Sequence, residues 1–370
     1  MHSSDIVVVG AGVIGCAVAY ELSRRGAAVQ VLDGRPPGMG ATHASAGVLA
    51  PYIEARDGGP LLDLTERSLS LYDDFVARLR SDTPVAFAYE RSGTLDVTLS
   101  AEGVQRFCEA AAAITARRQK AELLDARATH AAEPHLTGDA AGGLFIASHG
   151  FVAAPDLTIA LADAARRRGA IFAEPTEVRS IASTGTGMTV ESDRGTISAG
   201  TVVMAAGSWS GRIAIAHAPA MPVRPIRGQL LRLGWQDEPM PRVVWGERCY
   251  LVPWRDGTLL VGATVEDAGF DERTTIAGVR DLIDAACELV PYARTASFIG
   301  ARAGLRPGTP DHLPIVGVTE ATPNVIYATG HYRNGVLLAP LTAQVVADRL
   351  LSDVGDPSLA MTSPSRFGAV

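Results

Sequence analysis

The stretch DIVVVGAGVIGCAVAYELSRRGAAVQVLD, from Asp5 to Asp33, decides the fold of the N-terminal part of this chain. Its β-branched run, Ile6 to Val9, predicts a strand that is buried on both faces. Gly10, Gly12 and Gly15 follow in GxGxxG spacing, and the apolar residues after them recur with helical periodicity. A second apolar strand closes the stretch. The order strand, glycine turn, helix and strand predicts a Rossmann-like dinucleotide-binding unit.

Each glycine of this turn has its own physical role. Gly10 permits the tight passage from strand to helix, Gly12 lets the backbone approach a pyrophosphate, and Gly15 lets the helix pack closely on the strand. The helix N-terminus offers free N–H groups and a positive dipole end to the phosphates. Asp33 ends the second strand, where a carboxylate can accept from ribose hydroxyls and favours a ribose without a 2′-phosphate. The alternative is a glycine-rich turn without a ligand, and the motif does not separate NAD from FAD.

The next stretch, GRPPGMGATHASAGVLAPY from Gly34 to Tyr52, lacks strand patterning and is rich in small residues. An NAD-dependent dehydrogenase would continue here with regular βα units. A long irregular segment inside a compact domain usually carries function, and small residues would let its backbone lie against a flat ligand. The alternative is a solvent-exposed linker, although linkers are rarely so poor in charge. This stretch therefore favours a flavin over a nicotinamide cofactor.

Nucleotide-domain character returns only much later in the chain. TVVMAAGSWSGRI begins at Thr201 with a buried strand, which a turn of small residues follows. Before it lies a hairpin pattern with turns at Gly185 and Gly195. An amphipathic helix is predicted from Pro155 to Gly169, and Asp156 could cap it. The dinucleotide-binding domain is therefore expected to be discontinuous.

The intervening segments hold different material. Residues 85–99 look strand-rich, residues 101–120 and 123–133 look helical, and residues 275–290 form a further predicted helix. Short strands separated by turn residues recur over residues 222–265, which predicts an antiparallel sheet. The fold class is thus α/β plus antiparallel β, with a substrate domain inserted into a nucleotide-binding domain. The predicted nucleotide-binding domain comprises residues 1–84, 140–220 and 301–370, and the predicted substrate domain comprises residues 85–139 and 221–300.

Composition excludes several classes of function. The net charge is −7 and charged residues make up 20% of the chain, which argues against a nucleic-acid or anionic-membrane surface. The four cysteines show no CxxC pair and no metal-ligand spacing, so neither a metal site nor a disulfide framework is expected. No apolar run is long enough to span a membrane and no signal peptide is recognisable. We expect a cytoplasmic protein. The cysteines are Cys16, Cys108, Cys249 and Cys287.

Four motifs together resemble the D-amino-acid-oxidase-like family of FAD-dependent oxidoreductases. They are the N-terminal GxGxxG, ASAGVLAPY, VVMAAGSWS, and GLRPGTPDHLPIVG from Gly304 to Gly317. Two further motifs, CYLVPWRDGTLLVGAT and GHYRNGVLLAP near the C-terminus, resemble the glycine oxidase branch, whose members serve thiamine biosynthesis. The resemblance covers almost the whole chain, and the C-terminal motif is its most specific part.

This resemblance implies non-covalent FAD, because no cysteine lies near the C-terminal flavin loop. By position, the glycine turn would hold the pyrophosphate, the end of the second strand the ribose, and the irregular segment the pyrophosphate and isoalloxazine. The adenine would meet the backbone of Val178, and the loop before the last helix would close over the flavin. The implied cofactor residues are Gly10, Gly12, Ile14, Gly15, Asp33, Gly34, Ala41, Thr42, Ala46, Gly47, Val48, Val178, Gly330, His331, Tyr332, Arg333, Asn334, Gly335, Val336 and Leu337.

The resemblance also assigns Tyr250, Arg306 and Arg333 to substrate binding. A planar guanidinium binds a carboxylate in bidentate fashion, and a phenol can add a hydrogen bond. The helix starting near Asn334 would point its positive dipole end at the flavin. Structural alternatives stay open: Arg306 could stack on an aromatic ring or cap a turn, Arg333 could pair with an acid across the domain interface, and Tyr250 could be a core residue. Of the histidines, His331 is expected as a backbone neighbour of FAD rather than a catalyst.

The implied reaction is oxidative deamination of glycine, sarcosine or small D-amino acids. The substrate transfers a hydride from Cα to flavin N5, O2 is reduced to H2O2, and the imine is hydrolysed or passed to thiazole synthase. Relatives suggest a homodimer or homotetramer. No nucleic-acid, membrane or metal partner is expected. The main alternative is a D-amino-acid dehydrogenase that uses another electron acceptor; an NAD-dependent dehydrogenase and a non-catalytic nucleotide-binding module fit the motifs less well.

Three positions near the expected pocket bear on the preferred amine. Arg248 and Val265 stand where some relatives carry His and Met, and Ala50 leaves room at the substrate Cα. The preferred substrate could therefore shift from glycine. His149 and His312 are expected in surface loops without a catalytic role.

Overall fold

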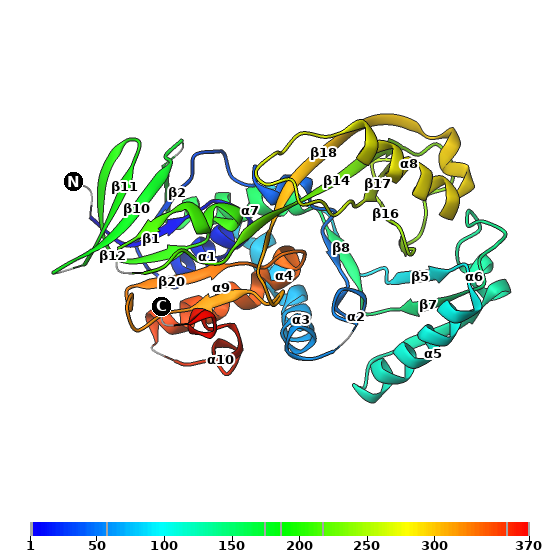
Figure 1. Cartoon of the computed structure of the whole chain (residues 1–370), viewed down its shortest axis with the longest axis horizontal. Coiled ribbons are helices and arrows are strands. Elements are labelled where there is room, and N and C mark those ends of the chain that lie inside the picture. Colours follow the sequence, from blue (N-terminus) through cyan, green and yellow to red (C-terminus); the bar gives the residue numbers. More distant parts are fainter. Residues whose placement is uncertain are drawn as a thin grey trace.

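The computed structural model describes residues 3–56, 58–173, 175–185, 187–216, 218–352 and 354–368. Figure 1 shows two large sheets toward opposite ends of the long axis, with helices gathered between and below them. The first sheet has the order β13-β10-β11-β12-β1-β2-β9, with β20 joining β12 and β19 joining β20. Its strands are β1 (Ser3–Val9), β2 (Val29–Leu32), β9 (Ile171–Ala173), β10 (Val178–Thr184), β11 (Gly187–Ser192), β12 (Gly195–Met204), β13 (Ala214–Ile215), β19 (Ile315–Gly317) and β20 (Val325–Thr329).

The parallel strands of this sheet confirm the Rossmann-like unit. β1 pairs in parallel with β2 on one side and β12 on the other, and β12 pairs in parallel with β20. The hairpin β10–β11 continues antiparallel to β12, as the turn pattern predicted. The helices that cover this sheet or follow it are α1 (Val13–Arg24), α2 (Pro51–Glu54), α3 (Pro60–Ser70), α4 (Tyr72–Asp82), α7 (Ala154–Arg167), α9 (Gly335–Leu351) and α10 (Ser358–Thr362).

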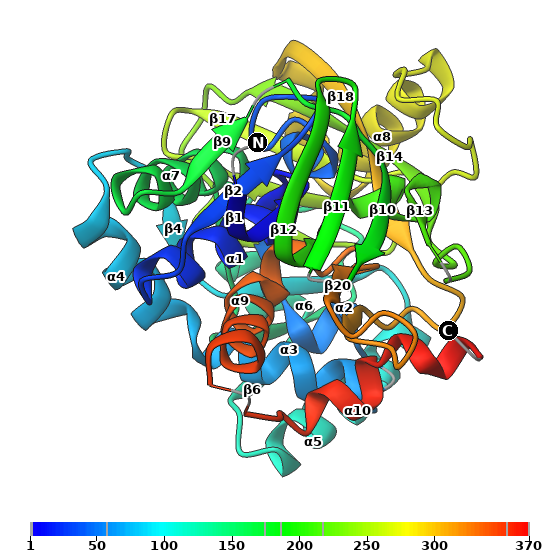
Figure 2. The same cartoon turned by 90° about the vertical axis from the view of Figure 1, so that its left-hand side faces the viewer.

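The main core forms around α1, which is buried along nearly its whole length. It packs against both α7 and α9, and α7 in turn lies beside α4 (Figure 2). Such enclosure needs small residues, and Ala17, Ala19 and Ala339 are fully buried at 0% exposure. A helix that is covered on all sides fixes the glycine turn at its start, which is where the sequence predicts the cofactor.

The second sheet is the predicted substrate sheet, with the order β18-β14-β17-β16-β15-β5-β7-β6. All its pairs are antiparallel except β15 with β5, which run in parallel. A small third sheet has the order β3-β8-β4. The strands are β3 (Val48–Leu49), β4 (Tyr89–Glu90), β5 (Thr94–Thr98), β6 (Ala121–Asp125), β7 (Gly142–Ile146), β8 (Gly150–Val152), β14 (Arg224–Gly234), β15 (Val243–Trp245), β16 (Tyr250–Pro253), β17 (Thr258–Gly262) and β18 (Ser297–Gly308).

The helices of the second sheet's part of the molecule are α5 (Ala101–Ala116), α6 (Ala126–Ala132) and α8 (Ile276–Leu289).

Two predictions about helix starts were wrong, one for α6 and one for α7. Residues 123–133 are not one helix, because Asp125 ends β6 and caps α6 by accepting from the Ala128 N–H at 2.7 Å. Asp156 does not cap α7: the helix starts earlier, after Ala153, and Asp156 lies in its first turn, where a negative charge suits the helix dipole.

The predicted fold class is confirmed, whereas the division into residue ranges stays a prediction. Two of its boundaries fall close to strands of one sheet. β7 begins just after residue 140 yet pairs with β5 and β6, and β18 runs across residue 300. The long strands β14 and β18 connect the two parts of the molecule, so their inner ends reach the nucleotide-binding sheet (Figure 1).

Candidate active site

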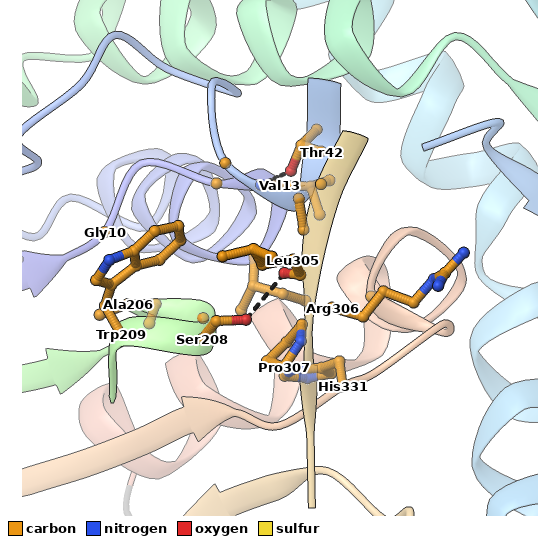
Figure 3. A pocket seen from close by; sticks show the side chains of 18 of the residues that line it. Gly10, Val13, Thr42, Ala206, Ser208, Trp209, Leu305, Arg306, Pro307 and His331 are labelled. Atoms are coloured by element: carbon orange, nitrogen blue, oxygen red, sulfur yellow. Dashed lines mark hydrogen bonds between the residues drawn. The ribbon is translucent and has the colours of Figure 1, made fainter. Parts of the chain in front are cut away.

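One large cavity, of about 720 Å³, runs from the glycine turn to the inner ends of β14 and β18. Figure 3 shows Gly10, Ala206 and Trp209 on one side of β18, and the Arg306 side chain extending on the other. The cavity thus has a nucleotide end and a charged end. Its walls come from both large sheets and from the irregular segment that begins at Gly34.

The glycine turn at the nucleotide end has the geometry that the sequence predicted. Gly10 has φ +107°, and a Cβ there would lie 2.4 Å from the Ala205 carbonyl oxygen. A Cβ on Gly15 would lie 1.9 Å from the Gly10 carbonyl oxygen, so both positions need glycine for the fold itself. A Cβ on Gly12 would meet protein only at 3.7 Å, from the Thr42 hydroxyl. Gly12 therefore keeps space free at the helix N-terminus, where a phosphate would bind.

The Asp33 carboxylate stands beside this turn. It accepts from the Ala11 N–H at 2.6 Å and from the Arg35 N–H at 2.8 Å. Burial raises the pKa of Asp33, while these two N–H donors and the Arg35 charge oppose the rise. Each carboxylate oxygen has a second lone pair, so the group can still accept from ribose hydroxyls.

The irregular segment lines the middle of the cavity through the 3₁₀ turn η1 (Ala41–Ala44) and the residues after it. Thr42 accepts from the Val13 N–H at 3.1 Å, which ties the segment to the start of α1 (Figure 3). Gly47 has φ +69°, and a Cβ there would lie 1.8 Å from the Val152 carbonyl oxygen. Only glycine therefore fits at this position, and the close contact with Val152 fixes the backbone that lines the cavity here.

Arg306, on β18, dominates the charged end. Its guanidinium donates to the Thr264 carbonyl oxygen at 2.9 Å and packs against Gly228, where a Cβ would come within 2.2 Å. No described acid forms an ion pair with it. Burial lowers the pKa of Arg306, yet an arginine keeps its charge in proteins. A partly desolvated cation without a counter-ion is costly, so a ligand carboxylate would complete this end of the site.

Arg333 behaves differently, because it already has a partner. Its Nε lies 3.0 Å from a carboxylate oxygen of Glu54, which forms an ion pair between the loop before α9 and the last residue of α2. The side chains are 28% and 14% exposed. Burial raises the pKa of Glu54, and the charges of Arg333 and Arg306 oppose this rise. The structural alternative for Arg333, an acid from a distant segment, is therefore present.

Tyr250 lies on β16 and lines the same end of the cavity. Burial raises the pKa of its phenol, against the smaller influence of Arg306 and Arg333, so the hydroxyl keeps its proton and can donate. Its ring packs on Trp245 with the centroids 4.7 Å apart, and it covers Gly262, where a Cβ would clash with it. Tyr250 is thus both a packed residue and an available donor.

The loop before α9 carries two unusual features. Tyr332 has φ +48°, uncommon for a residue with a side chain, and its N–H donates to the Pro307 carbonyl oxygen at 3.0 Å. His331 is buried, with Nε2 3.0 Å from the Thr342 hydroxyl, and burial lowers its pKa to about 3. The imidazole is therefore neutral at physiological pH. α9 begins at Gly335 after Asn334, as predicted, and the buried Asn334 Oδ1 has no partner in the described structure.

Most of the predicted site residues line the cavity. Four predicted cofactor residues do not line it: Gly15 in the first turn of α1, Gly330 and Asn334 in the loop before α9, and Leu337 in α9. The predicted residues that line the cavity are Gly10, Gly12, Ile14, Asp33, Gly34, Ala41, Thr42, Ala46, Gly47, Val48, Val178, Tyr250, Arg306, His331, Tyr332, Arg333, Gly335 and Val336.

Sequence reasoning missed several lining residues. Glu54 is the most important, and its only signal was an acid placed directly after an apolar, small-residue stretch. Trp209 and Ser208 also line the cavity, and the Ser208 hydroxyl fixes β18 by donating to the Leu305 carbonyl oxygen at 2.9 Å (Figure 3). The prediction for His149 was wrong. It is fully buried and stacked on Tyr52, with centroids 5.5 Å apart.

A second cavity, of about 420 Å³, adjoins the first, and we call it the outer cavity. The two cavities share Glu54, Tyr250 and Arg333 in their walls. Arg248 and Val265 line the outer cavity and not the main one, whereas the buried Ala50 lines neither. The residues of the outer cavity are Ile53, Glu54, Arg56, Asp96, Val97, Thr98, Arg106, Phe107, Trp245, Gly246, Glu247, Arg248, Cys249, Tyr250, Gly262, Ala263, Val265 and Arg333.

The described residues contain no group of His, Cys, Asp and Glu side chains that could hold a metal ion. Among the helices of this part of the chain, none is long and apolar enough to cross a membrane.

Comparison with known proteins extends these findings. The chain is 33% identical over 349 residues to the glycine oxidase of Geobacillus kaustophilus, covering 94% of this chain and 93% of that one. The crystal structure of glycine oxidase from the same organism matches with a TM-score of 0.94 and 32% identity, over 99% of both chains. The chain is also 36% identical to the bifunctional protein ThiO/ThiG of Nostoc sp., over 98% of this chain but 55% of the longer relative.

The model of the DAO family, described as FAD dependent oxidoreductase, matches residues 5–349. The site fits that cofactor: Gly12 keeps room for a phosphate, Asp33 retains acceptor capacity for a ribose, and the backbone around Gly47 lines the cavity. From its sequence, its fold and this site, the chain belongs to the DAO family of FAD-dependent oxidoreductases.

Proposed function

We propose that the protein oxidises glycine and other small primary or secondary amino acids. Sarcosine and small D-amino acids are the next candidates. The net reaction for glycine consumes O2 and water and yields glyoxylate, ammonia and H2O2. The observation that carries the proposal is Arg306, a partly buried guanidinium without an acidic partner among the described residues, at one end of a cavity that fits FAD. The relatives that share most of this chain's length support it by their names.

The chain's own residues account for binding and orientation. Arg306 would hold the substrate carboxylate by two parallel hydrogen bonds, and the protonated phenol of Tyr250 would donate a further one. This arrangement fixes the substrate Cα in one position, which lowers the entropic part of the barrier. When bound, FAD supplies the acceptor for the hydride that leaves Cα.

Proton handling needs little from the protein. The substrate amine must be neutral before Cα can lose a hydride. His331 is not suited to accept the amine proton, because burial lowers its pKa to about 3 and its Nε2 is hydrogen-bonded to the Thr342 hydroxyl. His331 is therefore a structural neighbour of the site. The amine proton is released to water, and the imine product is hydrolysed outside the protein's own chemistry.

The assembly and cellular context belong to the proposal as well. The bifunctional relative joins its matching part to further sequence in one chain, which supports handover of the imine to thiazole synthesis. We also propose a homodimer or homotetramer and a cytoplasmic location.

The test is spectroscopic. The purified protein is mixed anaerobically with glycine, sarcosine or D-alanine while the visible flavin absorbance is recorded, and air is then admitted. We expect bleaching, followed by recovery of the absorbance with production of H2O2. Bleaching without recovery in air would move the assignment to a dehydrogenase with another acceptor, and no bleaching with any of these amines would refute the proposal.

A further inference from the structure

The charged end of the main cavity contains two arginines in different electrostatic states. Arg306 has no acidic partner among the described residues, whereas Arg333 is paired with Glu54 at 3.0 Å. The pair stands where the main cavity meets the outer cavity, because both residues belong to both walls. The site therefore offers one unpaired guanidinium to a ligand and keeps the second one neutralised.

The outer cavity repeats this neutralisation. Each arginine described in its wall has a carboxylate of the chain beside it: Arg56 pairs with Asp96, Arg106 with Glu247 at 3.3 Å, and Arg248 with Glu288 at 2.5 Å. A second anionic group that reached this space would find no unpaired cation. It would instead meet the Glu54 carboxylate at the point of entry, and in a partly desolvated space like charges repel strongly.

Building on the proposed function, we propose that Glu54 is a specificity-determining residue. Its carboxylate acts as the protein's own counter-ion for Arg333, and it restricts the site to amines with a single carboxylate. The outer cavity has room for a substituent on the amine nitrogen, so exclusion of a second carboxylate rests on charge and not on space. Removing the charge of Glu54 would turn Arg333 into a second anion site, which takes N-carboxymethyl amines.

The test compares two secondary amines that differ only in the second carboxylate: sarcosine, with an N-methyl group, and iminodiacetate, with an N-carboxymethyl group. For Glu54→Gln we expect the ratio of kcat/KM for iminodiacetate to that for sarcosine to rise by about tenfold or more, the size of one charge-assisted hydrogen bond gained. Glu54→Asp keeps the charge and should keep the wild-type ratio. The double variant Glu54→Gln with Arg333→Gln should lose the gain.

A binding measurement separates this inference from turnover. Diglycolate and methoxyacetate have the same shapes as the two amines, but an ether oxygen replaces the nitrogen, so neither is oxidised as an amine. Calorimetric titration of the FAD-loaded protein should show that Glu54→Gln tightens diglycolate relative to methoxyacetate by about tenfold. Because this readout needs no oxidation, it tests the role of Glu54 even if the protein fails to oxidise glycine.

Two outcomes would overturn the proposal. One is an equal loss of affinity for both ether probes in Glu54→Gln, which would mean that Glu54 only supports the local structure. The other is the same gain in Glu247→Gln, a matched loss of charge on another wall of the outer cavity, because the effect would then come from the general field and not from the pair with Arg333.

Discussion

At the scale of single residues, Arg306 differs from Arg333 at the charged end of the main cavity. Arg333 is paired with Glu54, whereas Arg306 has no acidic partner among the described residues and can bind a ligand carboxylate. We expect Arg306→Lys to raise KM for glycine by about tenfold or more, since an ammonium keeps the charge but loses the bidentate geometry. The flavin absorbance should persist, as the substitution lies away from the glycine turn. Steady-state kinetics and a visible spectrum check both expectations.

The control for this substitution is Arg232→Lys, on the neighbouring strand β14. Arg232 is 43% exposed and pairs with Asp256 at 2.7 Å, outside both cavities. Its substitution should leave KM as in the wild type. A KM for Arg306→Lys equal to that of Arg232→Lys would show that Arg306 does not hold the substrate.

Asp96 predicts how stability changes with pH. It is 4% exposed, and burial raises its pKa to about 6, against the opposing charge of Arg56. Between the ordinary value of 3.8 and about 6, the folded protein keeps a proton that the unfolded chain has lost. The contribution of this group to the free energy of unfolding is therefore full at low pH and is lost as pH rises through that window, by on the order of 3 kcal/mol.

The measurement is urea unfolding across that pH window for the wild type and Asp96→Asn. The asparagine cannot titrate, so the variant should show a smaller fall in stability with rising pH. Asp281 is an exposed acid on α8, and Asp281→Asn is the matched control. Its stability should change with pH as that of the wild type does. Parallel curves for Asp96→Asn and the wild type would mean that Asp96 is ionised throughout.

Site residues were predictable from the sequence where a local pattern marks them, and they were missed where their role depends on a partner that is distant in the sequence. The glycine turn was predictable because its spacing is a local sequence pattern, although the carbonyl oxygen that excludes a Cβ at Gly10 belongs to the distant Ala205. Glu54 was missed because its role depends on Arg333. The two residues are far apart in the sequence, and only the folded structure brings them together. His149 was misplaced because the flanking serine and glycine suggest an exposed loop, whereas the His149 side chain is buried and stacks on Tyr52.

At the scale of elements, the close approach of α1 to β1 depends on Gly15. We expect Gly15→Ala to destabilise the protein by about 1–3 kcal/mol, because the new methyl group would push the helix away from the turn. The same movement would displace the helix N-terminus from the phosphate position, so the variant should also retain less FAD. Thermal unfolding and the ratio of flavin to protein absorbance measure the two effects.

Gly138→Ala serves as the control, because a Cβ there would meet no atom within 4 Å. It should unfold and retain FAD like the wild type. If Gly15→Ala behaved in the same way, the tight packing of α1 on the turn would not be needed for cofactor binding.

Elements were predictable where one periodicity covers the whole segment, as in α1, α8 and the hairpin β10–β11. They were mispredicted where a single residue changes the conformation partway. Asp125 divides a seemingly continuous helical segment into β6 and α6, because a capping aspartate starts a helix better than it continues one. The parallel pairing of β15 with β5 had no local signal, since register between distant strands is set by the whole sheet.

At the scale of the whole molecule, FAD should act as a structural component. The main cavity has a volume of about 720 Å³, and residues of both large sheets line it. Bound FAD would therefore add packing contacts to both sheets. We predict that FAD is not covalently attached and that its removal lowers the melting temperature. Free FAD at a thousandfold excess over its Kd stabilises a protein by about 4 kcal/mol by mass action.

The experiment removes FAD under mild denaturing conditions and follows thermal unfolding with and without added FAD. Riboflavin, which lacks the pyrophosphate and adenosine, should restore much less of the melting temperature than FAD. A melting temperature independent of FAD would contradict this prediction, and flavin that stays with the chain after acid precipitation would show covalent attachment.

The discontinuity of the nucleotide-binding sheet has a consequence for biosynthesis. β12 is hydrogen-bonded to β1 from the start of the chain and to β20 from near its end, and α9 covers α1 only after β20 has been made. A ribosome therefore exposes the glycine turn early but delivers its covering layers last. Until then the nascent chain presents an unpaired strand edge and an apolar helix face, the surfaces that chaperones bind and that aggregate when translation stops short.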